Sequence, residues 1–172
     1  DWASCGVRKD GGDDPDITDG ALVVAHVSYA DEPGVEIDGG EGVGRVTREG
    51  LDQPVGAAAI NSVPRQMIAS EVEAIAHDCD YDGGLRIEIS IPAGTELAKR
   101  TFNPRLGIEG GLSVLGTSGI VKPMSEDALV ASVQLELRQR HAEGARDILL
   151  CPGNYGWDFA RDELALDLKR GV

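Results

Sequence analysis

Glycine divides this chain into short apolar segments. Of its 172 residues 23 are glycine, while aromatic residues make up only 4% and hydrophobic residues 41%. Glycine adopts backbone conformations that other residues avoid, so its abundance predicts many tight turns. We therefore expect a folded globular protein whose core is built from Val, Ile, Leu and Ala instead of large aromatic side chains.

Charge and hydropathy narrow the classes of function. The net charge of -14 argues against nucleic-acid binding, which requires a basic face to neutralise phosphates. No apolar run approaches the ~20 residues that span a bilayer, and no basic-then-apolar signal segment is seen, so we predict a cytoplasmic protein that does not bind membranes. The cysteines are three in number and widely separated (Cys5, Cys79 and Cys151), which predicts reduced thiols.

The first part of the chain alternates strand patterns with one helix pattern. The β-branched run 21–30 predicts a strand, and 33–47 predicts two short strands broken by glycines. A helix is expected to follow Ser62, with a proline in its first turn, and the alternation in 85–91 indicates a half-buried strand. The expected apolar face of the helix carries Met67, Ile68, Val72 and Ile75. Residues 1–104 are thus predicted to form an α+β domain.

The second part has a different pattern. Short apolar runs at 112–115 and 147–151 predict buried strands, each ended by a glycine-containing loop. Helices are expected from Ser125 to about Arg140 and over 157–170. This order is typical of a parallel βαβ unit, so residues 105–172 are predicted to form a Rossmann-like α/β domain.

The two glycine loops are candidate ligand sites. Gly116, Thr117, Ser118 and Gly119 offer backbone N–H groups and hydroxyls, and Gly153, Asn154, Tyr155 and Gly156 offer an amide and an aromatic ring. In a parallel sheet both loops lie at the carboxyl ends of the strands, where ligands bind. The Tyr155 ring can stack on a flat ligand or attract a cation. Neither loop has dinucleotide or triphosphate spacing, and a simple helix-entry turn is the alternative for each.

Two charged clusters complete the candidates. Four carboxylates follow Lys9 (Asp10, Asp13, Asp14 and Asp16), a density that can bind a hard cation or orient a substrate, although a solvated turn explains it too. Lys99, Arg100 and Arg105 can hold substrate carboxylates, or can simply mark a charged linker between domains. Arg65, near a helix start, has the same ambiguity.

Five segments together resemble one family. KDGGDDPDITDGA, GGEGVGRVT, PVGAAAINSVPRQMI, LAKRTFNPRLGIEGGLSVLGTSGIVKPMSEDAL and CPGNYG are similar to the signature blocks of the cobalt-precorrin-5B C(1)-methyltransferases of cobalamin biosynthesis, in the family's order. The fourth block, 97–129, matches almost continuously. Gly11 stands where the family commonly has Ala, and Asp19 where it usually has His. The resemblance covers the central portion of the family's chain, since members have further segments before and after it.

The resemblance implies a function for the candidate residues. It implies S-adenosylmethionine as methyl donor over the two glycine loops, and a tetrapyrrole acceptor that contains the only cobalt, with cobalt-precorrin-6A as product. The acidic side chains of the macrocycle would meet a set of cations, and three carboxylates would bind ring nitrogens or accept a proton. The cations are Lys9, Arg65, Lys99, Arg105 and Lys122, and the carboxylates are Asp13, Asp14 and Asp16.

Two other classes remain open at the level of sequence. One is a non-catalytic module that binds a corrinoid or nucleotide. The other is a metal-dependent hydrolase that uses the carboxylates of residues 10–16. A homo-oligomer also remains open, and no protein-bound metal is expected for the methyltransferase.

Overall fold

The computed structural model describes residues 1–12, 16–116, 126–151 and 153–166. The strands are β1 (Trp2–Arg8), β2 (Leu22–Ala30), β3 (Gly34–Gly39), β4 (Arg45–Val46), β5 (Gly84–Ser90) and β6 (Ile108–Glu109). The helices are α1 (Ser62–Asp78), α2 (Gly94–Ala98), α3 (Asn103–Leu106), α4 (Glu126–Ala142) and α5 (Gly153–Asp162). The expected α+β character is therefore confirmed.

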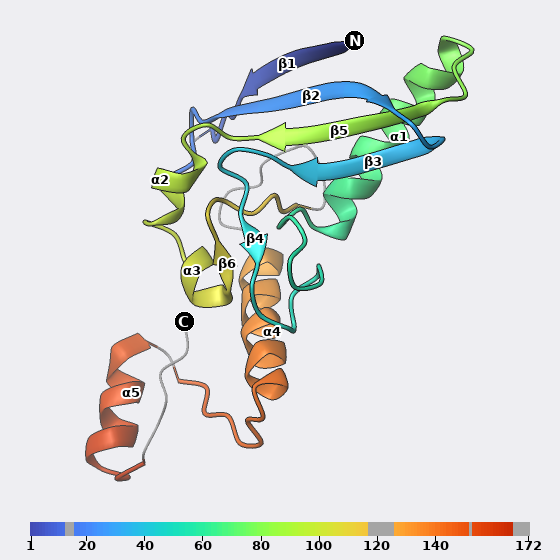
Figure 1. Cartoon of the computed structure of the whole chain (residues 1–172). Coiled ribbons are helices and arrows are strands. Elements are labelled where there is room, and N and C mark those ends of the chain that lie inside the picture. The colour runs from blue at the N-terminus through green and yellow to red at the C-terminus, as the bar shows by residue number, and fades with distance from the viewer. Residues whose placement is uncertain (13–15, 117–125, 152, 167–172) are drawn as a thin grey trace.

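A mixed four-stranded sheet organises the fold, in the order β1-β2-β5-β3 (Figure 1). β2 is antiparallel to both β1 and β5, whereas β3 and β5 are parallel, with Asp38 opposite Glu88. The strands β1, β3 and β5 consequently point the same way and end at one edge of the sheet, where β2 begins. We call this edge the carboxyl edge. β3 and β5 are joined through α1, so the parallel βαβ unit of this protein lies in its first half.

The core lies between this sheet and α1. Along β5, Ile87 and Ile89 are buried while Glu88 between them is exposed, as the alternating sequence predicts. Ile68 and Val72 of α1 pack against the same core cluster. On the opposite face, which we call the polar face, His26 and Ser28 of β2 lie beside Glu88 and Arg86 of β5. This arrangement is a two-layer α/β sandwich with one helix on one face.

α1 begins where the sequence predicts it. The Asp52 carboxylate accepts hydrogen bonds from the Ser62 backbone N–H (2.6 Å) and hydroxyl (2.8 Å), which satisfies one free donor of the first turn. Pro64 lies buried in that turn. The expected apolar face is only half correct, because Met67 is exposed and Ile75 is 63% exposed. Helical spacing identifies the apolar face of a helix, but it does not determine how many residues of that face the sheet covers.

A second, two-stranded sheet lies near the carboxyl edge (Figure 1). β4 and β6 pair antiparallel around Val46, Ala59 and Ile108, which form a second buried cluster. The expected strand over 112–115 is wrong: Leu112 and Val114 make only isolated bridges, to Val43 and Ile60. These pairings join residues 108–114 to residues 43–60. The domain boundary predicted at 105 remains a prediction.

The C-terminal segment departs most from expectation. The α4 helix is confirmed, and the Gln139 side chain attaches it to the end of α3 by donating to the Leu106 carbonyl. The buried strand expected over 147–151 is wrong, because this segment pairs with no strand in the described part of the chain and Leu150 is 68% exposed. A strand needs a neighbouring edge for its backbone hydrogen bonds, and none of the described strands offers one here. The Rossmann-like arrangement stays a prediction.

Two further expectations concern cysteine and membranes. Cys5, Cys79 and Cys151 are free thiols. Across the described ranges, no helix combines the length and the apolar character needed to cross a bilayer.

The last helix, α5, starts at Gly153 and ends at Asp162, earlier at both ends than the expected 157–170.

Candidate functional site

The acidic loop between β1 and β2 lies at the carboxyl edge. Backbone hydrogen bonds from Lys9 N–H to the Ala21 carbonyl and from Gly20 N–H to the Lys9 carbonyl, both 2.9 Å, extend the β1–β2 ladder into this loop. Asp19 accepts a 2.7 Å hydrogen bond from the Gly11 N–H and ties the two sides together. The described flanks of the loop are thus held in place by both backbone and side-chain contacts. Asp13 and Asp14 lie outside the described residues.

Lys9 and Asp16 form the polar centre of the loop. The Lys9 ammonium contacts the Asp16 carboxylate directly and donates to the Thr18 hydroxyl at 2.6 Å. Asp16 also accepts from the Thr18 N–H at 2.9 Å and from its hydroxyl at 2.7 Å. The structure therefore brings together two residues that the sequence placed in different roles. Each has a partner within the chain.

These contacts change the chemistry available to Asp16. Burial by itself would raise the pKa of the Asp16 carboxyl, but the hydrogen bonds from Lys9 and Thr18 outweigh it, so the pKa lies below its ordinary value. A carboxylate with a lowered pKa is a weaker base. The geometry thus favours a role for Asp16 in holding the loop over a role as proton acceptor.

We expect Asp16 to contribute to acid sensitivity. Because its pKa is lower in the folded than in the unfolded protein, its stabilising effect is present above the unfolded value of about 3.9 and is lost as pH falls through the folded value. Asp16→Asn should therefore reduce the loss of unfolding free energy below about pH 4, measured by urea denaturation at several pH values. Asp31→Asn, in an exposed turn, should keep the wild-type pH dependence. Identical pH profiles for wild type and Asp16→Asn would contradict the assignment.

Glycine contacts bring three more segments to the same edge. The backbones of Gly42, Gly94 and Gly111 approach so closely that a Cβ on any of them would overlap the backbone of another segment. The Ile91 N–H donates to the Glu41 carbonyl at 2.7 Å, which fixes the start of α2 against the turn after β3. Figure 1 shows α2 at this end of the sheet. The residues that follow α2 thus continue from this end of the sheet.

The predicted cationic side chains differ in the contacts they make within the chain. Lys99 is exposed and pairs with Glu96 at 2.6 Å, and Arg105 is exposed with its guanidinium 5.9 Å from the centre of the Phe102 ring. Both head groups remain accessible to a ligand. Arg65 instead donates to the backbone carbonyls of Ile60 (2.8 Å), Ile37 (2.7 Å) and Ala58 (3.4 Å). Those contacts favour a structural role. Lys122 lies outside the described residues.

The two glycine loops have different outcomes. Thr117, Ser118 and Gly119 are outside the described residues, and Gly116 is exposed with φ of 142°. Gly153, Asn154, Tyr155 and Gly156 do not form a loop, since they are the first turn of α5. The Tyr155 ring is 92% exposed and therefore free to stack on a ligand. The donor site formed by these two segments remains a prediction.

Two groups at the carboxyl edge were missed by sequence reasoning. Arg45 donates to the Asp38 carboxylate through both terminal guanidinium nitrogens, at 2.6 and 3.0 Å, and this hydrogen bonding holds the pKa of Asp38 below the usual range despite burial. Asn103 is buried and bridges the Gly111 carbonyl and the Ser113 hydroxyl, each at 3.3 Å. A signal existed for the first pair, because Asp38 and Arg45 flank the glycine-rich turn 39–44. For Asn103 the only signal in the sequence was a polar residue between Phe102 and Pro104.

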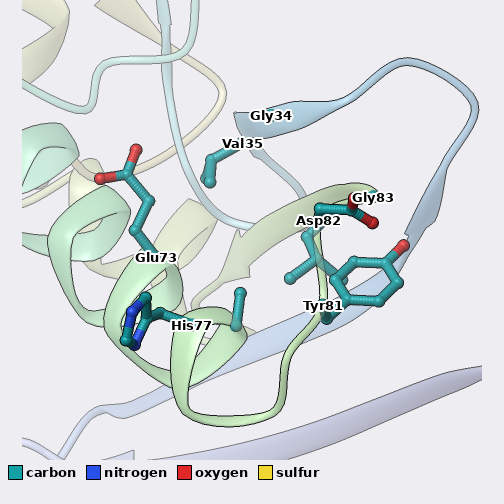
Figure 2. A pocket seen from close by; sticks show the side chains of 9 residues that line it. Gly34, Val35, Glu73, His77, Tyr81, Asp82 and Gly83 are labelled. Carbon is teal, nitrogen blue, oxygen red and sulfur yellow. The ribbon is translucent and has the colours of Figure 1, made fainter.

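A separate recess lies at the other end of the sheet. It has a volume of about 290 Å³ and lies between the end of α1 and the starts of β3 and β5 (Figure 2). Val35 and Leu85 are apolar parts of its lining, and Glu73, His77 and Asp82 are polar parts. None of the predicted site residues that the structure describes lines it. It is therefore not the site that the sequence motifs describe.

Comparison with known proteins shows which family the chain resembles. A family model described as CbiD matches residues 1–123. Proteins named cobalt-precorrin-5B C(1)-methyltransferase are similar: that of Ruminiclostridium cellulolyticum is 49% identical over 98% of this chain and 44% of its own length. That of Geobacillus kaustophilus is 52% identical over 94% and 43%, and that of Pseudomonas aeruginosa (strain LESB58) is 51% identical over 95% and 45%.

A solved structure agrees with these matches. The crystal structure of a cobalamin biosynthesis protein (cbiD) from Archaeoglobus fulgidus superposes with a TM-score of 0.56 and 28% identity, over 95% of this chain and 51% of that chain. The protein is an α+β protein built on a mixed four-stranded sheet. It belongs to the CbiD family. The chain spans less than half the length of the curated relatives described above.

Proposed function

We propose that this chain is part of an S-adenosylmethionine-dependent methyltransferase that methylates carbon 1 of cobalt-precorrin-5B, giving cobalt-precorrin-6A. The observation that carries this proposal is the identity of about half of all positions with relatives named for that activity, over nearly the whole chain. The acidic loop and the cationic segment after α2, which the resemblance linked to the substrate, lie within residues 1–123, which the family model matches.

The proposed reaction requires little from the protein except placement. The donor supplies a methyl group: the carbon–sulfur bond breaks, its electron pair stays on sulfur, a carbon–carbon bond forms at carbon 1, and the macrocycle loses a proton. Holding two reactants in register can lower a barrier by roughly 7–11 kcal/mol. We infer that the carboxyl edge provides one side of this arrangement, and that a Rossmann-like second domain, not formed by the described residues, provides the other.

The roles of individual residues follow from their accessibility. Lys99 and Arg105 are exposed and suit the carboxylates on the rim of the macrocycle, with Lys122 proposed to join them. Lys9 and Asp16 are proposed to position the loop, so that Asp13 and Asp14 face the ring and accept its proton. The exposed Tyr155 ring suits stacking on the donor, whereas the helical backbone at Gly153 does not offer a loop for it.

The test uses a full-length protein that contains this chain. Incubation with cobalt-precorrin-5B and S-adenosylmethionine should add the mass of one methylene unit to the corrinoid, measured by mass spectrometry. Asp14→Asn should lower the rate by about 10²–10⁴ with little change in corrinoid affinity. Arg105→Ala and Lys122→Ala should each weaken corrinoid binding by about tenfold or more, as expected for a lost charge-assisted hydrogen bond.

The same assay separates the rival classes. A binding module would retain the corrinoid without any mass change, and a metal-dependent hydrolase would lose activity with a chelator. The Lys9 ammonium already occupies the Asp16 carboxylate, which disfavours a divalent metal at that carboxylate. Corrinoid retained without a mass gain would overturn the proposal.

A further inference from the structure

Phe102 is an exposed aromatic residue at the start of α3, which lies beside β6 (Figure 1). Its side chain is 58% exposed. A phenyl ring has no polar atom that gains from contact with water, but a single exposed apolar side chain is common on protein surfaces and by itself indicates no function. Two further observations, on the backbone and on the charges around this ring, distinguish Phe102 from such a residue.

The backbone on both sides of Phe102 is fixed by contacts with the body of the fold. Asn103 is buried, and its amide donates to the Gly111 carbonyl at 3.3 Å. The Thr101 hydroxyl donates to the Ala98 carbonyl at 2.9 Å and accepts from the Asn103 N–H at 3.2 Å. The exposed ring is therefore presented from a fixed backbone, which reduces the entropy that is lost when a ligand binds to it.

Positive charge surrounds this ring, although the chain as a whole has a net charge of -14. Residues 97–108 contain three cations, Lys99, Arg100 and Arg105, and no carboxylate. The fold adds a fourth cation from a distant part of the sequence, because Arg48 donates to the Arg105 carbonyl at 3.2 Å. All four side chains belong to exposed residues. Local cations of this kind attract an anionic ligand even where the overall charge is negative.

The carboxylates near these cations are held only weakly. Lys99 pairs with Glu96 at 2.6 Å, and Arg48 approaches Glu143 at 3.6 Å. The Lys99 and Arg48 side chains nevertheless remain 64% and 51% exposed. Exposed ion pairs contribute little to stability, so a carboxylate of a ligand can replace either acidic partner.

We propose that Phe102 is the residue that selects a flat tetrapyrrole: its ring stacks on the macrocycle while the surrounding cations bind the carboxylates on the rim. The Arg105 guanidinium lies 5.9 Å from the centre of the Phe102 ring. A stacking surface and a bidentate carboxylate partner are thus side by side, as a ligand that is both flat and polyanionic requires. This role rests on the proposed methylation of a corrinoid and adds a specificity-determining residue to it.

Binding of a cobalt porphyrin separates stacking from charge. The probe is cobalt uroporphyrin, a flat macrocycle with carboxylates around its rim, titrated by absorption with the full-length protein that contains this chain. Phe102→Ser should weaken binding about tenfold at low and at high salt alike, because stacking is not screened by ions. Arg105→Ala should weaken binding more at low than at high salt, because an exposed charge is screened. If Phe102 only held the cations in place, its effect would shrink with salt in the same way.

Three further variants control for the change at this position. Phe102→Tyr keeps an aromatic ring and should bind the porphyrin like the wild type. Phe159→Ser is the matched control, since Phe159 is 57% exposed on α5, and it should leave the affinity unchanged. Because the Phe102 ring is exposed, Phe102→Ser should keep the wild-type urea transition. If it does not, Phe102→Leu replaces it, with an expected loss of affinity of at least about threefold.

Methylation of cobalt-precorrin-5B by the wild-type protein is measured in parallel by mass spectrometry. Methylation together with unchanged porphyrin affinity in the folded Phe102 variant, or with a loss that shrinks with salt, would refute the role of Phe102 and leave the proposed function standing. A salt-independent loss without methylation would refute the proposed function and leave tetrapyrrole binding through Phe102 in place. A wild-type protein that does not bind the porphyrin would also refute the role of Phe102.

Discussion

Gly42→Ala should leave the chain without a stable fold. Gly42 has φ of 72°, and a Cβ there would overlap the Ile91 carbonyl group, whose carbon would be 2.9 Å away, and lie 3.0 Å from the Gly94 nitrogen. The left-handed conformation costs an L-residue about 1–2 kcal/mol, and forcing atoms into a filled space costs about 1–3 kcal/mol more. Both neighbours are backbone, so no side chain can rotate out of the way.

The hydrogen bonds around Gly42 increase the cost. Its carbonyl accepts from the Leu112 N–H at 2.8 Å, and the Gly44 N–H donates to the Leu112 carbonyl at the same distance. Moving Gly42 to relieve the overlap breaks the contact between the turn after β3 and residues 111–112. Summed with the strain, the loss approaches the lower end of the about 5–15 kcal/mol by which domains are stable. We expect Gly42→Ala to lack a cooperative transition in urea, followed by circular dichroism.

Gly110→Ala is the matched control. Gly110 has a similar φ of 82°, but a Cβ there meets nothing within 4 Å. The substitution therefore carries the backbone strain without the overlap, and should cost only about 1–2 kcal/mol. If both variants lost the same amount of stability, the close approach at Gly42 would not be the cause.

Arg65→Met should destabilise the fold by about 2–4 kcal/mol. The Arg65 guanidinium is the partner of three backbone carbonyls, two of which belong to the buried residues Ala58 and Ile60. Hydrogen bonds to a charged group contribute about 1.5–3 kcal/mol, and a buried acceptor left unsatisfied costs about 1–3 kcal/mol. Methionine fills a similar volume, so the effect measured in urea is that of the lost donors. Arg65→Lys should recover only part of it, since one ammonium cannot reach all three carbonyls.

Arg86→Met controls for the loss of a surface arginine. Arg86 is exposed on the polar face of β5 and approaches Glu36 at only 3.8 Å. An exposed pair of this kind contributes about 0–1 kcal/mol. The comparison also tests the earlier hypothesis that Arg65 binds substrate. If Arg65→Met kept wild-type stability and lost corrinoid affinity in the full-length protein, the substrate role would stand and the structural one would fall.

Local pattern was sufficient for the elements whose residues determine their own conformation. The strand at 85–91 followed from strict alternation, and the helix after Ser62 from its start signals. Local pattern failed at 147–151, where an apolar run does not form a strand. Periodicity describes which side chains would share a face. It does not supply the neighbouring edge that a strand needs.

The candidate site was likewise predictable from the sequence only in part. The sequence identified the acidic loop and the cations of 99–105 by their chemistry, and family resemblance gave them a proposed substrate. It could not show that Lys9 and Asp16 contact each other, because their pairing depends on how the loop folds back across the end of β1. Nor could it separate Arg65 from Arg105. A guanidinium beside buried carbonyls and one on an open surface look alike in a sequence.

The sequence by itself determined the family, the strands and helices of residues 20–91, and the positions of glycine. The tertiary structure alone decided that three strands end at one edge and that Gly42, Gly94 and Gly111 meet there. The reason is physical: conformational preference is a property of a few neighbouring residues. Proximity between residues 42 and 111 is a property of the whole chain, set by which surfaces can be buried together.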